Sequence, residues 1–221
     1  MNRYLILSTS NFFKKKIKKN FFYFINNPKS LSLKKVKKIN PDIIFVPHWN
    51  WKISNDICRN YKVIIFHSTP LPHGRGGTPI QNMIQRGHKK TKICAIEAKD
   101  KYDSGKIFLE RSMSLSGTAN IIFNRMYKII VKMIFSMIKK LPKPRKQKGA
   151  TLLFKRRTCA DSNLKGLQSI KQMYDYIRML DSDKKNFPKA YLELKKIKFV
   201  FSKAKILKNK IIAHCVIQKS N

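Results

Sequence analysis

Short apolar runs alternate with amphipathic or lysine-rich stretches along the first half of the chain. The apolar runs predict β-strands at Tyr4–Leu7, Phe21–Ile25, Asp42–Val46, Val63–Phe66, Lys92–Glu97 and Lys106–Arg111. Helical patterns separate several of them, at 11–19, at 33–39 and from Pro79 onward. The runs at 42–46 and 63–66 are nearly continuous, which is typical of strands buried on both faces of a parallel sheet. This alternation predicts an α/β fold with a Rossmann-like, twisted and mostly parallel sheet.

A long helical pattern, from about Thr118 to Lys140, follows the last of these strands. Its apolar residues recur at helical spacing, but Arg125, Lys128 and Lys132 interrupt them. We therefore expect a packed amphipathic helix and no transmembrane segment, with a helix lying on a membrane surface as the alternative.

A basic, proline-containing segment at 142–150 predicts a linker between two parts of the chain. The expected organisation is a main domain at 1–141 and a short C-terminal appendage at 151–221. Within the appendage, the pattern predicts a helix over about 167–180 and strands at 198–201 and 211–216.

The chain carries a strong excess of positive charge. It has 49 Lys and Arg residues against 11 Asp and Glu residues, a formal net charge of +38. Such a surface attracts polyanions, so RNA, a phosphate-bearing substrate or a membrane surface is a candidate partner. An AT-rich coding sequence is the alternative explanation, although AT-rich codons also specify the scarce acidic residues. The charge alone does not identify the substrate.

The four cysteines form neither a CxxC pair nor a metal-ligand spacing with the five histidines, so we expect no metal site. The first residues run into a lysine-rich stretch without the small-residue cleavage pattern of a secretory signal. These features favour a reducing cytoplasm with free thiols. The sequence gives no indication of the oligomeric state.

The first candidate for chemistry is His67, at the end of the strand predicted at 63–66. A loop rich in proline and glycine follows it, with Arg75 as a positive donor, and a helix begins near Pro79. Ligands of open α/β sheets bind beyond the carboxyl ends of the strands, where His67 is expected to lie. The alternative is a polar residue that merely ends a strand.

The second candidate is Asp103, in the loop between the strands predicted at 92–97 and 106–111. It stands in a tight Asp-Ser-Gly turn of a chain that has few acidic residues. Asp in a turn often only hydrogen-bonds its own backbone, and that is the alternative for Asp103.

Together these segments resemble the formyltransferase family. The family has a strand ending in Asn-x-His, a Ser-Leu-Leu-Pro-like loop, an Arg-Gly followed by Pro, and later an Asp-x-Gly turn. The matching segments here are His67-Ser-Thr-Pro-Leu-Pro72, Arg75-Gly76-Gly77-Thr78-Pro79 and Asp103-Ser-Gly105. Weaker similarity continues through Phe154-Lys-Arg-Arg157, so that the resemblance covers roughly residues 40 to 195. Each motif is weak by itself, and their order gives the set its specificity.

The resemblance implies the formyltransferase fold, with 1–141 as the catalytic domain. It implies an enzyme that transfers a formyl group from 10-formyltetrahydrofolate, its co-substrate, to an amine. His67 would stabilise the oxyanion of the tetrahedral intermediate or relay the proton of the amine. Asp103 would orient His67 or accept a proton through water. The residues expected to line the folate pocket are Pro47, Trp49, Leu71, Pro72, Gly76 and Gly77.

The chain departs from the family pattern at Ile65, which stands where the family has its asparagine. The groups that could contact the oxyanion or the substrate instead are Arg75, Asn50, Asn82 and His48. The change at Ile65 also leaves open a degenerate member of the family without catalysis.

Two acceptor amines compete. The appendage is short for a full RNA-binding barrel, which favours a small molecule such as a nucleotide-linked amino sugar, and this is our main expectation. The charge of +38 favours the alternative, the amino group of methionyl-tRNA.

Overall fold

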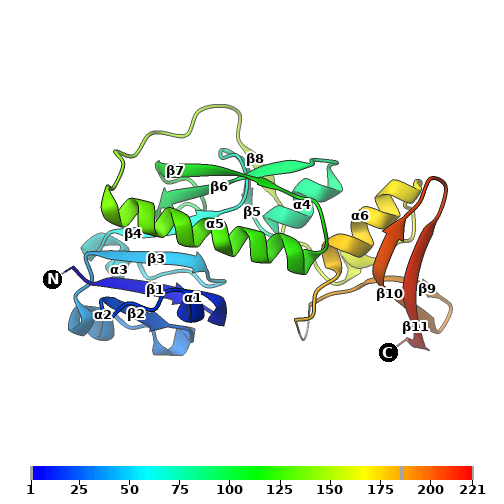
Figure 1. Cartoon of the computed structure of the whole chain (residues 1–221), viewed down its shortest axis with the longest axis horizontal. Helices are drawn as coiled ribbons and strands as arrows, with labels where there is room; N and C mark the ends of the chain where they lie inside the picture. Colours follow the sequence, from blue (N-terminus) through cyan, green and yellow to red (C-terminus); the bar gives the residue numbers. More distant parts are fainter. Residues whose placement is uncertain (1, 185–186, 221) are drawn as a thin grey trace. The chain divides into compact units, whose positions relative to one another are not determined.

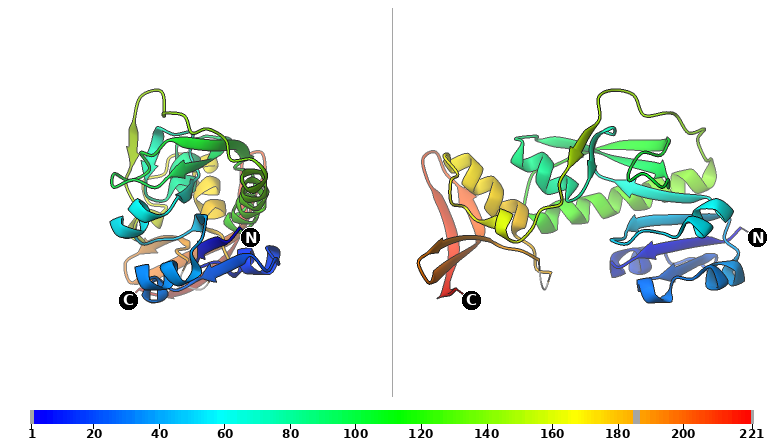
Figure 2. Two further views of the ribbon diagram at one scale, coloured as in Figure 1. Left: turned by 90° about the vertical axis from the view of Figure 1, so that its left-hand side faces the viewer. Right: turned by 180° about the vertical axis from the view of Figure 1, so that it is seen from behind.

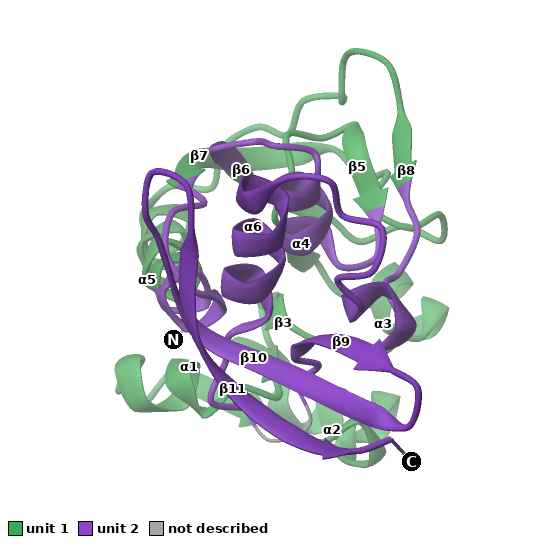
Figure 3. Cartoon of the chain, turned by 90° about the vertical axis from the view of Figure 1, so that its right-hand side faces the viewer, with its two compact units in different colours: residues 1–75, 92–113, 125–153 green, residues 76–91, 114–124, 154–221 purple. Residues whose placement is uncertain are grey.

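The computed structural model describes residues 2–184 and 187–220, and the chain divides into two compact units (Figure 3). The first unit consists of residues 1–75, 92–113 and 125–153, and the second of residues 76–91, 114–124 and 154–221. The last boundary between the two units, between residues 153 and 154, lies close to the expected end of the linker at residue 150. The second unit also includes the earlier segments 76–91 and 114–124.

A six-stranded sheet forms the centre of the first unit (Figure 1). Its order is β2 (Phe22–Ile25), β1 (Tyr4–Ser8), β3 (Ile43–His48), β4 (Val63–His67), β6 (Lys90–Glu97) and β7 (Ile107–Ser114). The first four strands are parallel to one another, and β6 runs antiparallel to β4. The predicted α/β class with a mostly parallel sheet is thereby confirmed. All the strands expected here are present.

The core of this sheet follows from its continuous apolar strands. Leu5, Leu7, Ile44 and Val46 are buried and pack in one cluster, together with Val63. Full burial of each such side chain contributes about 1.5–3 kcal/mol to the free energy of folding relative to exposure. This burial holds the strands against the helices that cover the sheet.

Short helices connect the parallel strands. They are α1 (Asn11–Lys16), α2 (Leu33–Ile39) and α3 (Asn55–Asn60). The hydroxyl of Ser32 accepts a hydrogen bond from the Lys35 amide at the start of α2, and Asn40 ends that helix in the left-handed conformation at φ 48°. The sequence pattern predicted α1 and α2 but not α3, which has only 6 residues.

The long helix α5 (Ala119–Lys139) runs along one face of the sheet in the first unit (Figures 1 and 2). Tyr127 contacts Phe12 and Phe13, and Phe135 contacts Phe22. Its apolar side is thus used for packing, as expected for an amphipathic core helix. None of the helices in the described part of the chain has the length and apolar character needed to cross a bilayer.

The second unit contains an antiparallel sheet of three strands, in the order β11 (Ile211–Lys219), β10 (Ile197–Ile206) and β9 (Ala190–Leu194). Helix α6 (Ile170–Leu180) packs on β10 and on α4 (Pro79–Gln85). The predicted helix and the last two predicted strands are confirmed, whereas β9 was not predicted. A further short pair, β5 (His73–Gly76) with β8 (Leu152–Phe154), was also missed.

Candidate active site

His67 is the last residue of β4, and its side chain is buried in the first unit, with 7% of the residue exposed. Both nitrogens of its ring face acceptor groups. The Nε2 atom lies 2.7 Å from the carbonyl oxygen of Gly74, and the Nδ1 atom lies 3.4 Å from Oδ1 of Asp103. The structure therefore brings together the two residues on which the sequence analysis centred.

These partners constrain the protons on the ring. A carbonyl oxygen only accepts hydrogen bonds, so Nε2 carries a hydrogen. The Nδ1 atom faces the Asp103 carboxylate, which is also an acceptor of hydrogen bonds. With Nε2 as a donor and the Asp103 carboxylate on the other side of the ring, the imidazole is suited to stabilising an oxyanion through a hydrogen bond.

Asp103 lies in the turn between β6 and β7, where its backbone adopts the left-handed conformation at φ 52°. Gly105 makes this turn possible, since a Cβ atom at that position would fall 1.8 Å from the carbonyl oxygen of Glu97. The Glu97 amide in turn donates to the Lys106 carbonyl at 2.9 Å. The conformation of the turn thus brings the carboxylate back toward β4.

Gln147 is a site residue that the sequence analysis missed. Its Nε2 donates to the carbonyl oxygens of Asp103 and Gly105, both at 2.8 Å, and its Oε1 accepts from the Arg75 guanidinium at 2.7 and 3.1 Å. The segment 142–150 was predicted only as a linker, and the contacts of Gln147 give it a second role that the composition did not indicate. The one available signal was an uncharged amide within a run of Lys and Arg.

Ile65 occupies the position of the family asparagine, is partly buried and packs against the core of the first unit. It pairs with Val46 and Ile96 in the neighbouring strands and packs against the clusters around Ile44 and around Leu71. An apolar side chain at this position therefore has a packing role that an amide would not fill.

The thiol of Cys94 lies beside the His67 loop and donates to the Thr69 carbonyl at 3.2 Å. Burial raises the pKa of the Cys94 thiol to about 11. It is thus neutral at physiological pH and unsuited to act as a nucleophile.

His48, another candidate, ends the neighbouring strand β3 and has different surroundings. Its Nδ1 lies 3.4 Å from the Thr9 hydroxyl, and its ring centroid lies 5.6 Å from that of Tyr127. Trp49 and Trp51 follow it and meet edge to face at 5.3 Å. Pro47 is buried and Asn50 is exposed. Roles for these residues in binding folate or substrate stay predictions.

The remaining candidates lie in the loop after His67 and in α4. Leu71 and Pro72 are buried. In the second unit, Cβ atoms at Gly76 and Gly77 would fall 2.5 Å from Phe154 and Arg156 respectively. These glycines thus admit a close approach of the segment around Phe154 and Arg156. Their expected place in the folate pocket stays a prediction.

Asn82 is engaged within the second unit. Its amide nitrogen donates to the carbonyls of Gly77 and Lys155, at 3.0 and 3.1 Å, and its oxygen accepts from Arg86 at 2.9 Å. A contact of Asn82 with substrate stays a prediction.

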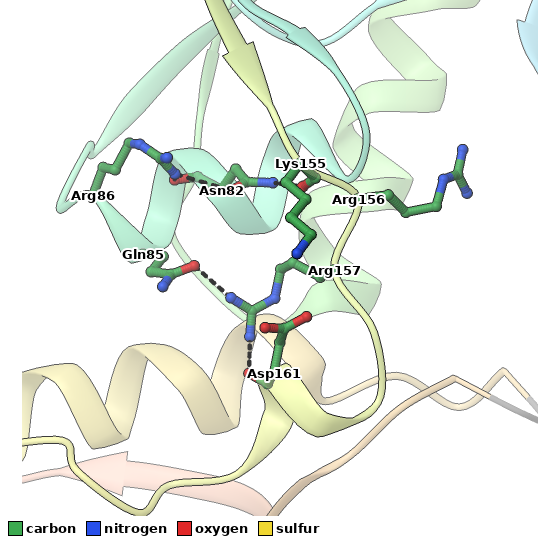
Figure 4. A pocket seen from close by; sticks show the side chains of 7 residues that line it. All are labelled: Asn82, Gln85, Arg86, Lys155, Arg156, Arg157 and Asp161. Carbon is green, nitrogen blue, oxygen red and sulfur yellow. Dashed lines mark hydrogen bonds between the residues drawn. The ribbon is translucent and has the colours of Figure 1, made fainter.

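A basic cavity of about 390 Å³ lies in the second unit (Figure 4). The residues that line it are Asn82, Gln85, Arg86, Lys155, Arg156, Arg157 and Asp161. Arg157 hydrogen-bonds the Gln85 side chain and the Asp161 carbonyl, and Figure 4 shows the Lys155 side chain directed toward Arg157. Hydrogen bonds from the Thr158 amide and hydroxyl lower the pKa of Asp161, which is the only acidic residue in this lining. The excess of cations suits a phosphate group.

Known proteins share this architecture. A sequence model described as formyl transferase matches residues 17–124, and one described as methionyl-tRNA formyltransferase, C-terminal domain, matches residues 159–218. The solved structure of methionyl-tRNA formyltransferase from Clostridium thermocellum superposes with a TM-score of 0.92 at 39% identity, over 100% of both chains. This chain belongs to the formyltransferase family.

Two further relatives define the range of the similarity. The methionyl-tRNA formyltransferase of Sulfurihydrogenibium sp. is 28% identical over 81% of this chain, which spans 58% of that relative's length. A sugar N-formyltransferase from Shewanella sp. shares the fold, with a TM-score of 0.70 at 18% identity over 94% of this chain and 100% of that one. The family assignment made from the sequence motifs is confirmed.

Proposed function

We propose that the chain transfers the formyl group of 10-formyltetrahydrofolate to the amino group of methionyl-tRNA. The observation that carries the reaction is the buried imidazole of His67, held between the Gly74 carbonyl and the Asp103 carboxylate. It supplies a preorganised hydrogen-bond donor at the carboxyl end of β4, where open α/β sheets bind their ligands.

The choice of acceptor rests on the comparisons and replaces our main expectation of an amino sugar. The similarity to a methionyl-tRNA formyltransferase extends over the whole chain at 39% identity, against 18% for the sugar N-formyltransferase. The appendage, which is short for a full RNA-binding barrel, matches the C-terminal domain of methionyl-tRNA formyltransferases over residues 159–218. The net charge of +38 and the basic cavity around Arg157 suit a polyanionic acceptor.

In the proposed reaction the neutral amine attacks the formyl carbon, and a carbon–nitrogen bond forms. The carbonyl oxygen takes the negative charge and accepts a hydrogen bond from His67, whose ring is oriented by Asp103 on its other side. The bond from the formyl carbon to N10 of the folate then breaks. The amine loses its proton, and N10 gains one. The Gly74 carbonyl must give up Nε2 of His67 when the formyl oxygen arrives.

The test uses the purified full chain with 10-formyltetrahydrofolate and methionyl-tRNA, and follows the formation of formylmethionyl-tRNA and the release of tetrahydrofolate. We expect turnover, and we expect His67→Ala and Asp103→Ala each to lower it by about 10²- to 10⁴-fold. His88→Ala, an exposed histidine, is the matched control and should retain activity.

Two results would count against the proposal. Undiminished transfer in both His67→Ala and Asp103→Ala would exclude the assigned site. Turnover of a pool of nucleotide-linked amino sugars in place of methionyl-tRNA would keep the reaction but overturn the acceptor. The salt dependence separates these acceptors independently, since binding of tRNA weakens steeply with salt and binding of a small substrate does not.

A further inference from the structure

We infer that Gln147 is a positioning residue for the His67–Asp103 pair. Its amide connects the turn that carries Asp103 to the loop that carries Gly74 and Arg75, and these two segments hold opposite sides of the His67 ring. The kinetic part of this inference rests on the proposed function, whereas its structural part does not.

Gln147 itself is held by the strand beside it. Two residues earlier, Arg145 exchanges backbone hydrogen bonds with Ile107 at 2.8 and 2.9 Å, at the start of β7. The Arg145 guanidinium also donates to Glu110 at 2.7 Å. The backbone before Gln147 is therefore fixed to the same strand that leaves the Asp103 turn. A side chain anchored in this way can hold the turn that carries Asp103 in a fixed position.

The amide of Gln147 uses its full hydrogen-bonding capacity. Two N–H groups donate to two carbonyls, and one oxygen accepts from two nitrogens of Arg75. Its orientation is settled by these partners, since carbonyls need a donor and a guanidinium needs an acceptor. Glutamate would set a negative oxygen against two carbonyls, and lysine would offer Arg75 no acceptor. The position thus selects for a primary amide.

The connection acts on both contacts of His67. On one side, the Asp103 carbonyl is fixed in a residue with φ 52°, and its carboxylate reaches 3.4 Å from Nδ1. On the other side, Arg75 follows directly after Gly74, whose carbonyl lies 2.7 Å from Nε2. Loss of the amide frees both segments together. A displacement on the order of 1 Å at a reacting group can cost about 10²-fold in rate.

The experiment compares Gln147→Leu, which removes all four hydrogen bonds at similar size, with Gln147→Glu, which keeps an acceptor for Arg75. Lys146→Ala and Lys148→Ala are matched controls, because both neighbours are exposed. The measurements are kcat and the KM for 10-formyltetrahydrofolate in the methionyl-tRNA reaction. The imidazole carbon–proton NMR signal of His67 is recorded without substrates and assigned with His67→Ala.

We expect kcat to fall about 10- to 10²-fold in both Gln147 variants while the KM for the donor changes little. We also expect the His67 signal to move toward its position in Asp103→Asn, and the lysine variants to match the wild type. Gln147→Asn carries the same amide on a side chain one methylene shorter, and it replaces Gln147→Leu if that variant does not fold. We expect its His67 signal to shift in the same direction by a smaller amount.

A wild-type His67 signal in a folded Gln147 variant would overturn the inference, and so would a fall in transfer that arises only from KM. If the wild type does not formylate methionyl-tRNA, the proposed function fails while the NMR comparison still decides the role of Gln147.

Discussion

His48 and His67 end neighbouring parallel strands, yet their surroundings differ in ways that the strand pattern does not reveal. Both follow apolar runs, and β3 and β4 pair in register through Val46 and Ile65. His67 is buried beside a carboxylate, whereas His48 is half-buried beside a hydroxyl and a phenol. A strand end places a histidine at the ligand-binding edge of the sheet. The turn at Asp103, distant in the sequence, decides which of the two histidines has a carboxylate beside its ring.

The largest effect on this difference between His48 and His67 is expected from a change in the turn that carries Asp103. Gly105→Ala places a methyl group against the Glu97 carbonyl and forces the turn to shift. We expect kcat to fall by about 10- to 10²-fold and the free energy of unfolding to fall by about 1–3 kcal/mol. Transfer assays and chemical denaturation measure the two effects. Gly87→Ala is the control, because a Cβ there meets nothing within 4 Å although the backbone has φ 79°. Equal losses in both variants would contradict this account.

A second substitution tests the residue in β4 that departs from the family pattern, Ile65. Ile65→Asn restores the family residue two positions before His67 but removes an apolar side chain from the core. We expect the free energy of unfolding to fall by about 1–3 kcal/mol, since a polar amide replaces packed apolar surface. Urea denaturation of the variant and of Ile65→Val separates the polar effect from the loss of volume. A variant as stable as the wild type would show that the position tolerates the amide, and that packing does not explain the isoleucine.

The smallest effect is expected beside His48. Burial raises the pKa of Tyr127 to about 12, and a hydrogen bond with Ser10 opposes this rise. A phenol whose pKa is higher in the folded state contributes stability that is fully present below pH about 10 and is lost as the pH rises toward 12. We expect the free energy of unfolding to decline over this interval, and Tyr127→Phe to remove part of the decline. Parallel declines in both proteins would contradict the burial effect. Transfer near neutral pH should be unchanged in the variant.

The sequence predicted what depends on local pattern. The apolar runs located every strand of the main sheet, and Ser32 marked the start of α2. The ordered motifs selected His67 and Asp103, which the fold brings to 3.4 Å from one another. These features follow from residues close together in the chain, or from the edge of the sheet at which strand ends meet.

The missed features depend on contacts between distant segments. Gln147 reaches Asp103 and Arg75 from a segment whose composition indicates only a linker. Gly76 and Gly77 lie against Phe154 and Arg156, where a Cβ atom would not fit, and no local sequence pattern predicts this approach. Strand β8 has only three residues, too few for a recognisable period.

The Gly74 carbonyl has a consequence for affinity. It lies 2.7 Å from Nε2 of His67, so the resting protein provides this ring with an internal ligand of its own. In the proposed reaction, an arriving formyl oxygen would compete with that ligand, and the apparent affinity for the donor would be reduced by the fraction of molecules in which the carbonyl remains bound. Under the proposed function, the chain would thus give up part of its affinity for the donor in return for a hydrogen-bond donor that is already oriented before the substrate arrives.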